Sequence, residues 1–341
     1  MTTTFLITGC NGLVGFPILT TALEAGHNVR YAVRSEDKAR VVSSNPAVQK
    51  LAPGDRLSAV VIPDFTAEGA FDDAFKGVTH IIHTGSPVLM PWYEPIKDIF
   101  EPTRKISSSI LSSTLKTSSI QSVVITSSIV GNLGLVPPAH VVSAATRVPL
   151  PDPFPQALDT GYEAYVLGKV AELHDTDRFI REKNPPFRVA HVNPGYVYGR
   201  NELALDIKAM TEHNSSNNAL IKGFVGGEVG WPVHRGFVHV DDLAEVHLRV
   251  ALLDPKLHPE APRDFGVAIR VDHADIFGYV EKAFPKAVRD GVFKKGHVPM
   301  LEFQWDSSDV EKLMDGKLKS FETAVVDVAA QYLEILGKEK A

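Results

Sequence analysis

The chain has 341 residues, of which 44% are hydrophobic and 22% charged, and its formal net charge is -6. This composition is typical of a globular protein that buries a sizeable core. We expect no nucleic-acid or membrane partner, because neither a strongly basic run nor an apolar stretch of membrane-spanning length is present. The lone cysteine, Cys10, excludes an internal disulfide and suits a reducing compartment, so we expect a cytoplasmic protein.

Short runs rich in valine and isoleucine alternate with helix-length segments through the first 200 residues. This alternation predicts parallel strands joined by helical crossovers. Strands are expected at residues 5–8, 29–33, 58–62, 80–83, 122–126 and 188–192. Helices are expected at residues 16–25 and 162–181, and a last one places Val325, Val328, Ala329, Leu333 and Leu336 on one face.

Two later regions break this pattern. Six prolines lie between Gly131 and Gly161, which predicts a long loop of the kind that is usually functional. After Asn201 the periodicity weakens and glycines cluster. The sequence therefore predicts an α/β fold in which a smaller, more irregular C-terminal part packs on a parallel-sheet domain.

A glycine-rich turn follows the first expected strand and opens the first expected helix. Its three glycines allow a tight turn, a close approach by a pyrophosphate, and close packing of helix on strand. The helix N-terminus adds free N–H groups and a positive dipole end. A glycine-rich turn without a ligand is the alternative, which the position at the start of an α/β pattern disfavours. The residues expected to bind a dinucleotide here are Thr8, Gly9, Asn11, Gly12, Leu13, Val14 and Gly15.

The end of the second expected strand indicates which dinucleotide binds. An NAD site usually has a carboxylate about 20 residues after the glycines, but here the strand ends in Arg34 and Ser35, with Lys38 nearby. A guanidinium fits a phosphate well. We therefore expect NADP(H), with Arg34 on the 2′-phosphate and Ser35 or Lys38 assisting. Solvated charges in a strand–helix loop remain the alternative.

A tyrosine and a lysine four residues apart, Tyr165 and Lys169, share one face of an expected helix. A nearby ammonium stabilises a phenolate, so this tyrosine becomes a usable proton donor. The spacing alone proves little, because Tyr93 and Lys97 repeat it. We set that second pair aside because Pro95 lies within it and discourages a regular helix.

Two hydroxyls, Ser127 and Ser128, end the strand that precedes the Tyr165 helix. Parallel sheets place ligands at the carboxyl ends of their strands. One of these hydroxyls can therefore hydrogen-bond a substrate oxygen as charge develops on it. Ser128, Tyr165 and Lys169 are the expected catalytic residues, and we expect no metal in the site.

Taken together, these features resemble the extended short-chain dehydrogenase/reductases of the NAD(P)-dependent epimerase/dehydratase superfamily. The branch that looks most similar contains dihydroflavonol reductase, cinnamoyl-CoA reductase and the yeast-type carbonyl (methylglyoxal) reductases. Further segments carry the resemblance over roughly residues 4 to 336. They are Asp64-Phe65, His83-Thr84-Gly85-Ser86-Pro87, Asn193-Pro194-Gly195-Tyr196-Val197-Tyr198-Gly199, Phe237-Val238-His239-Val240-Asp241-Asp242-Leu243-Ala244 and Trp305-Asp306-Ser307-Ser308 with Lys312-Leu313.

The resemblance implies a Rossmann-type doubly wound parallel sheet with a smaller C-terminal substrate-binding domain. Residues 1–200 and 236–262 would form the NADP-binding domain, and residues 201–235 and 263–341 the substrate domain. Besides the glycine turn and the Arg34 region, it implies further contacts to the cofactor. These involve Asp64, Phe65, Thr84, Gly85, Ser86, Ser127, Tyr165, Lys169, Pro194, Gly195 and Val197.

Three departures from the family pattern limit what it implies. Sugar dehydratases have Asp-Glu where this chain has Ser127 and Ser128, which argues against dehydration of a nucleotide sugar. The asparagine that this branch usually carries near Lys105 is missing, so the support of a proton relay is in doubt. Residues 131–161 lack the pattern expected of flavonoid reductases, and we do not predict a flavonoid substrate.

The predicted activity is NADPH-dependent reduction of a hydrophobic aldehyde or ketone to an alcohol by a monomer or homodimer. The alternatives are an epimerase or hydroxysteroid-type dehydrogenase of the same superfamily, or a dinucleotide-binding sensor without chemistry. Arg34 argues against the epimerase, and the intact Tyr165–Lys169 pair argues against the sensor. Expected substrate contacts are Val88, Ser128, Phe154, Tyr162, Tyr196, Phe224 and Trp231, of which Phe224 and Trp231 equally suit a core or an interface.

Overall fold

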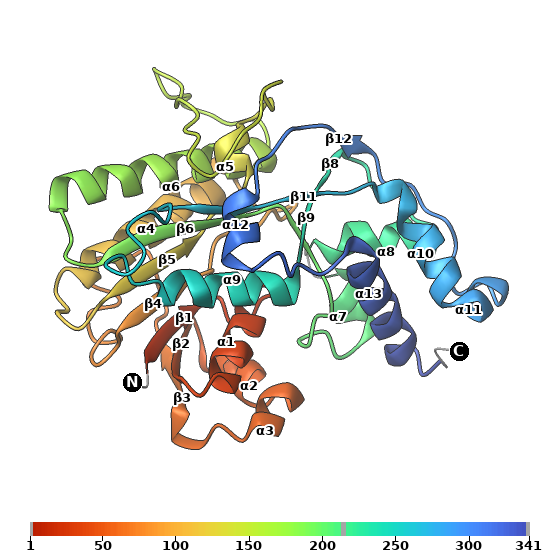
Figure 1. Ribbon diagram of the computed structural model, residues 1–341, viewed down its shortest axis with the longest axis horizontal. Coiled ribbons are helices and arrows are strands. Elements are labelled where there is room, and N and C mark those ends of the chain that lie inside the picture. Colours follow the sequence, from red (N-terminus) through yellow and green to blue (C-terminus); the bar gives the residue numbers. More distant parts are fainter. Residues whose placement is uncertain (1–2, 213–215, 339–341) are drawn as a thin grey trace.

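The computed structural model describes residues 3–212 and 216–338 (Figure 1). Within these residues, seven parallel strands form a sheet with the order β10-β6-β5-β4-β1-β2-β3. The order reverses between β1 and β4, which is where doubly wound sheets bind ligands. The strands are β1 (Thr4–Thr8), β2 (Asn28–Val33), β3 (Leu57–Val61), β4 (His80–His83), β5 (Ser122–Thr126), β6 (Arg188–Pro194) and β10 (Phe265–Val267). The doubly wound fold and six of these strands confirm the prediction.

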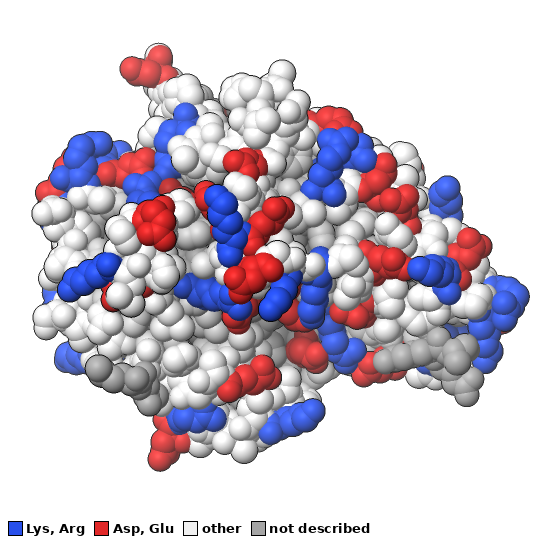
Figure 2. All heavy atoms as spheres, viewed as in Figure 1, with Lys and Arg blue, Asp and Glu red and all other residues white. Residues whose placement is uncertain are grey.

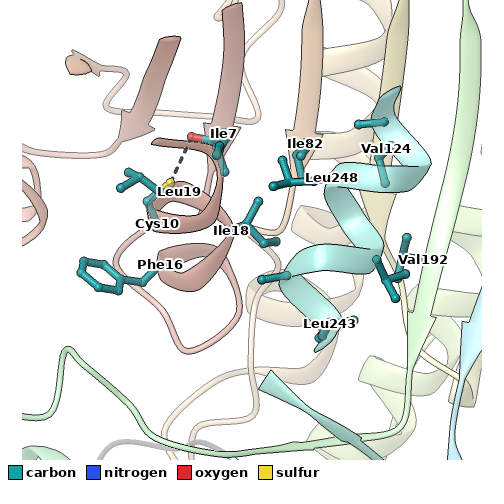
Figure 3. Close-up of a cluster of buried hydrophobic side chains, with 14 of the residues drawn as sticks. Ile7, Cys10, Phe16, Ile18, Leu19, Ile82, Val124, Val192, Leu243 and Leu248 are labelled. Atoms are coloured by element: carbon teal, nitrogen blue, oxygen red, sulfur yellow. Dashed lines mark hydrogen bonds between the residues drawn. The ribbon is translucent and has the colours of Figure 1, made fainter. Parts of the chain in front are cut away.

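Helices cover both faces of the sheet (Figure 1). On one face, α1 (Gly15–Glu24) and α9 (Val240–Leu252) lie side by side, and α12 (Ser308–Leu313) contacts α9. Figure 3 shows apolar side chains of α1 and α9, among them Ile18 and Leu248, in one cluster with Ile82 and Val124 of the strands. The other face carries α4 (Glu101–Thr114) and α6 (Gly161–Lys183). The strands are apolar on both faces because both faces are buried.

A second hydrophobic core lies beside the sheet. It is built around α8 (Asn217–Val225), α10 (Ile276–Ala283) and α13 (Phe321–Ile335), which Figure 1 shows grouped at one end of the molecule. The division of the chain into a cofactor domain and a substrate domain stays a prediction. Near this core lie α7 (Ile207–Glu212), α11 (Pro285–Arg289), a sheet of β11 (Ile269–Arg270), β9 (Gly236–His239) and β7 (Tyr196–Tyr198), and the pair β12 (Met300–Leu301) and β8 (Val233–His234).

The remaining elements are short. The segment after β2 forms α2 (Glu36–Ser43), α3 (Pro46–Leu51) and a 3-10 turn (Gly54–Arg56), and another 3-10 turn lies at His273–Asp275. A π-helical turn (Pro95–Phe100) leads into α4, so Tyr93 precedes the helix that carries Lys97. After the single turn of α5 (Val130–Leu133), residues 134–160 run as an irregular loop that rises above α5 and α6, as predicted (Figure 1).

Charges of both signs are interspersed over the face shown in Figure 2. In the described part of the chain, no helix combines the length and the apolar character needed to cross a membrane.

Candidate active site

The first part of the site is the glycine turn between β1 and α1. Gly9 has a φ of +76°, and a Cβ there would lie 2.3 Å from the Thr84 hydroxyl oxygen. A Cβ on Gly15 would lie 2.4 Å from the Gly9 carbonyl oxygen. The Thr84 hydroxyl donates to the Thr8 carbonyl at 2.7 Å. Only glycine fits at positions 9 and 15, because the turn packs tightly between the ends of β1 and β4.

The same turn leaves its outer side open. A Cβ on Gly12 would meet only the Gly9 carbonyl oxygen, at 3.3 Å. No side chain caps α1 at Val14, and its first turn has no acidic residue. Leu13 and Val14 are half-buried and Asn11 is exposed. The arrangement is therefore an uncapped helix N-terminus behind an open glycine, which suits an anion.

Arg34, Ser35 and Lys38 gather at the end of β2. Among the residues that the structure describes, neither Arg34 nor Lys38 has an ion-pair partner, because Asp37 pairs with Arg40 instead. The Ser35 hydroxyl accepts from the Lys38 N–H at 3.4 Å and so caps α2. Burial, together with the charge of Arg34, lowers the pKa of the Lys38 ammonium. Two uncompensated cations therefore lie beside each other, as an added phosphate would require.

The segments after β3 and β4 lie at the same edge of the sheet. Asp64 is exposed, and its carboxylate accepts from the Thr66 N–H at 2.8 Å. Phe65 is buried, with its ring 5.2 Å from that of Phe71. The Gly85 N–H donates to the Thr8 hydroxyl at 3.3 Å, which joins the ends of β4 and β1.

Two buried hydroxyls near the strand ends, those of Ser86 and Ser127, have no hydrogen-bond partner within the described residues. Buried polar groups are nearly always satisfied, so unpaired ones indicate a missing ligand or water. Together with the open glycine turn, they show that the residues present fit a dinucleotide lying across the strand ends. Asp64, Thr84, Gly85, Ser86 and Ser127 all lie at this edge.

Lys169 is held at the end of β5. Its side chain is 2% exposed, and its ammonium donates to the Thr126 carbonyl oxygen at 3.2 Å and to the Glu172 carboxylate at 3.0 Å. An ammonium has three N–H donors, so one remains for a ligand or for Tyr165. Tyr165 lies one turn earlier on α6 and is partly exposed, and Ser128 is the second residue after β5. The three predicted catalytic residues therefore belong to one strand end and the helix that crosses it.

Two residues of this site were missed by the sequence analysis, Glu172 and Ser107. Glu172 is 1% exposed and accepts from the Ser107 hydroxyl of α4 at 2.7 Å. Burial alone would raise the pKa of the Glu172 carboxyl, but the charge of Lys169 and the Ser107 hydrogen bond outweigh it and lower that pKa. Burial lowers the pKa of nearby His83 to about 4, with the charge of Glu172 opposing this shift and that of Lys169 adding to it. The predicted catalytic lysine therefore belongs to a buried ion pair.

The expected substrate contacts divide into two groups. Val88, Tyr162 and Trp231 are at least 40% exposed, and the Tyr162 hydroxyl bonds the His234 ring at 3.2 Å. Burial, with the nearby phenols of Tyr162 and Tyr165, raises the pKa of Tyr196 to about 12. These three tyrosines therefore lie close together.

Two phenylalanines from the expected contacts are packed inward. The Phe154 ring stacks on Phe100 at 4.7 Å. Phe224 is fully buried, 5.2 Å from the Phe293 ring, so it belongs to the second core, which was the alternative for this residue.

The segment after β6 is fixed by its own close contacts. A Cβ on Gly195 would lie 2.5 Å from the Gly236 carbonyl oxygen, and the Gly195 N–H donates to the Val267 carbonyl at 2.9 Å. Pro194 and Val197 are buried on either side. This segment, too, begins at the carboxyl edge of the sheet.

Comparison with known proteins identifies relatives of this chain over most of its length. The profile of the NAD dependent epimerase/dehydratase family matches residues 5–261. Ketoreductase CTB6 of Cercospora beticola is 31% identical over 98% of this chain and 96% of its own. The NAD-dependent epimerase/dehydratase ALT6 of Alternaria alternata is 32% identical over 97% of this chain and 98% of its own. The structure of yeast methylglyoxal/isovaleraldehyde reductase Gre2 complexed with NADPH shares the fold with a TM-score of 0.79 at 21% identity, over 98% of this chain and 100% of that one.

The glycine turn, the strand-end hydroxyls and the buried lysine thus lie in a chain that matches one family over most of its length. The chain belongs to the NAD-dependent epimerase/dehydratase family, as an extended short-chain dehydrogenase/reductase, and is an oxidoreductase that uses a nicotinamide dinucleotide.

Proposed function

We propose that the protein is an NADPH-dependent ketoreductase that reduces a hydrophobic aldehyde or ketone to the alcohol. The observation that carries the proposal is the Lys169 ammonium, fixed by the Thr126 carbonyl and Glu172 one turn from Tyr165. The relative named as a ketoreductase and the similar fold of a methylglyoxal reductase support it. We further propose that the protein works in the cytoplasm as a monomer or homodimer, with a small carbonyl compound as its partner.

In the proposed reaction, Ser128 binds the substrate carbonyl, Tyr165 transfers the proton and Lys169 stabilises the phenolate. When bound, the nicotinamide supplies a hydride to the carbonyl carbon. Ser128 donates a hydrogen bond to the carbonyl oxygen as negative charge develops on it. Tyr165 gives its hydroxyl proton to that oxygen, and the Lys169 ammonium stabilises the phenolate that remains. The chain thereby orients the reactants and supplies one proton.

The preference for NADPH rests on Arg34 and Lys38. Both cations are free of carboxylate partners in the part of the chain that the structure describes, where Asp37 pairs with Arg40, and a 2′-phosphate would pair with them. The preference for a hydrophobic carbonyl rests on the apolar and aromatic walls, Val88, Phe154, Tyr162, Tyr196 and Trp231. An epimerase that keeps NAD bound would not need the Arg34 site. Analysis of the nucleotide that co-purifies with the protein separates these two functions.

The test compares Tyr165→Phe with Tyr93→Phe. The first removes the proton donor and should lower kcat by about 100-fold or more. The second repeats the substitution in the other Tyr-x-x-x-Lys pair and should leave kcat unchanged. Turnover is followed as loss of NADPH absorbance with a panel of aldehydes and ketones. NADPH affinity, measured by fluorescence, should stay within a few-fold in both variants. Unimpaired turnover in Tyr165→Phe contradicts the proposal.

A further inference from the structure

A second phenol lies beside Tyr165 on α6. Tyr162 is three positions earlier on the helix, and residues with this spacing are neighbours on one helix face. The cap of α6 fixes its place, because the Thr160 hydroxyl accepts from the Glu163 N–H at 3.0 Å. Burial, with the Tyr165 phenol, raises the pKa of Tyr162, so its hydroxyl keeps its proton at neutral pH. The proposed reaction uses the Tyr165 proton alone, which leaves Tyr162 as a second donor without an assigned role.

The Tyr162 hydroxyl is bonded to a buried histidine. His234 of β8 is 4% exposed, and its Nε2 lies 3.2 Å from the Tyr162 oxygen. The Phe303 ring lies edge-on to the His234 ring, with 5.6 Å between the centroids. Burial lowers the pKa of His234 to about 4, so the imidazole is neutral at neutral pH. A neutral imidazole has one N–H donor and one acceptor nitrogen.

The second nitrogen of the His234 ring indicates the direction of this hydrogen bond. His234 Nδ1 is buried and has no hydrogen-bond partner within the described residues. A buried N–H without an acceptor is rarer than an acceptor without a donor, so the ring proton belongs on Nε2. Nε2–H then donates to the Tyr162 oxygen. The hydrogen of the Tyr162 hydroxyl is therefore left for another acceptor.

Tyr196 is held in a similar way. The Trp231 indole can only donate, and its hydrogen bond to Tyr196 opposes the effect of burial on the pKa of that phenol. The charges of Tyr162 and Tyr165 also act on Tyr196, so the three phenols lie close together. A carbonyl oxygen has two lone pairs, which the hydroxyls of Ser128 and Tyr165 fill in the proposed reaction. The Tyr162 hydrogen therefore needs a second acceptor atom.

We propose that Tyr162, oriented by His234, donates a hydrogen bond to a second oxygen atom of the substrate. The preferred substrate is then an apolar carbonyl compound that carries another oxygen acceptor near the reacting carbonyl, as a keto ester does. The inference rests on the proposed function, because it concerns which carbonyl compounds that reaction accepts. Tyr162 is a specificity-determining residue, and His234 is a positioning residue that acts through it. A site built to hydrogen-bond a substrate group discriminates against the analogue that lacks the group.

The experiment measures kcat/KM with NADPH for two ketones of equal chain length. Ethyl acetoacetate carries a second carbonyl oxygen, and 2-heptanone does not. The selectivity ratio is kcat/KM for the keto ester divided by that for 2-heptanone. Intrinsic reactivity cancels when the ratio of a variant is compared with that of the wild type. The variants are Tyr162→Phe, His234→Leu, His234→Gln and the double variant Tyr162→Phe/His234→Leu. The matched control is Tyr332→Phe, because Tyr332 lies on α13 against Phe224 and Phe293 of the second core.

Tyr162→Phe should lower the selectivity ratio about 3- to 10-fold, the effect of one neutral hydrogen bond. Tyr332→Phe should leave the ratio unchanged. His234→Leu should lower it as well, whereas His234→Gln should retain most of it, because its amide N–H can replace Nε2–H. In the double variant, the loss should equal that of Tyr162→Phe alone, because His234 acts through that hydroxyl. A purely structural role would instead lower both kcat/KM values together.

An unchanged selectivity ratio in Tyr162→Phe would overturn the inference. A wild type that reduces 2-heptanone as well as the keto ester, or that reduces other carbonyl compounds but not the keto ester, would overturn it too. Additive losses in the double variant would show that His234 does not act through Tyr162. Each of these results leaves the proposed function standing. A wild type that oxidises no NADPH with any carbonyl compound would contradict the proposed function itself.

Discussion

The paired cations Arg34 and Lys38 give the sharpest test of cofactor choice at a single residue. Arg34→Asp removes a charge-assisted contact worth about 1.5–3 kcal/mol and adds repulsion. NADPH should therefore bind roughly 10- to 100-fold more weakly, with a smaller effect on NADH. The control is Arg40→Asp in the following helix α2, where the arginine is paired with Asp37. Titration of both nucleotides checks this, and an undiminished NADPH preference would show that Arg34 does not discriminate.

Individual site residues differed in how far the sequence could predict them. The places of Tyr165, Lys169 and Ser128 in the fold were predictable, because strand ends and the helix period define where such side chains go; their catalytic role stays a prediction. Glu172 was not, because a glutamate three residues after a lysine on a helix is usually a solvated surface pair. Its burial depends on how α6 rotates against α4, and this follows from packing rather than from local sequence.

The glycine turn can be tested as an element, because its glycines serve different purposes. Gly15→Ala places a Cβ 2.4 Å from the backbone of Gly9. Such overpacking should lower the free energy of unfolding by about 1–3 kcal/mol. Gly12→Ala meets only one atom, at 3.3 Å, so stability should change little while the new methyl group obstructs the pyrophosphate.

Thermal unfolding and NADPH titration of both variants separate these effects. Gly12→Ala should lower NADPH affinity by about tenfold or more, because the added methyl group keeps a phosphate away from the backbone N–H groups of the turn. A Gly12→Ala protein that binds NADPH normally would show that the turn holds no phosphate at this point.

A buried charge network connects three other elements. Asp264, just before β10, has a side chain only 4% exposed and is bonded by Arg147 of the long loop, by Arg263 and by His191 of β6. Asp177 of α6 binds the same two arginines. Burial alone would raise the pKa of Asp264, but His191 and Arg263 hold it well below its usual range.

Asp264→Asn should therefore destabilise the fold by about 1–3 kcal/mol, because it removes the charge of a buried hydrogen-bonded carboxylate while Asp177 still pairs with both arginines. A carboxyl with a lowered pKa adds stability above its unfolded pKa of about 3.9 and loses it as the pH falls through the folded value. The difference between wild type and variant should stay constant from about pH 8 to pH 5 and narrow only below about pH 4. Urea unfolding measures it, and Asp175→Asn, in a half-exposed pair, is the control. A difference that narrows near neutral pH would contradict this assignment.

At the scale of the whole molecule, the long strands of the main sheet were easier to predict than the short strands and the second hydrophobic core. Alternating strands and helices follow a period that can be recognised locally, so six strands of the main sheet and its helices α1 and α6 were predictable. Strand β10 has three residues and pairs with β6, far away in the chain. Strands β8 and β12 have two residues each, too few to show a period. Such elements form only because the surrounding fold brings their backbones together.

The uneven burial of the site has a consequence for how such proteins diversify. Lys169 is 1% exposed, whereas Val88, Tyr162 and Trp231 are 46%, 40% and 53% exposed. Substitutions at exposed positions usually change stability by less than about 0.5 kcal/mol. If these side chains line the carbonyl site as proposed, selection can reshape its walls one mutation at a time without unfolding the protein around Lys169. In the proposed enzyme, substitutions at these exposed positions can change the substrate preference while the buried Lys169 stays the same.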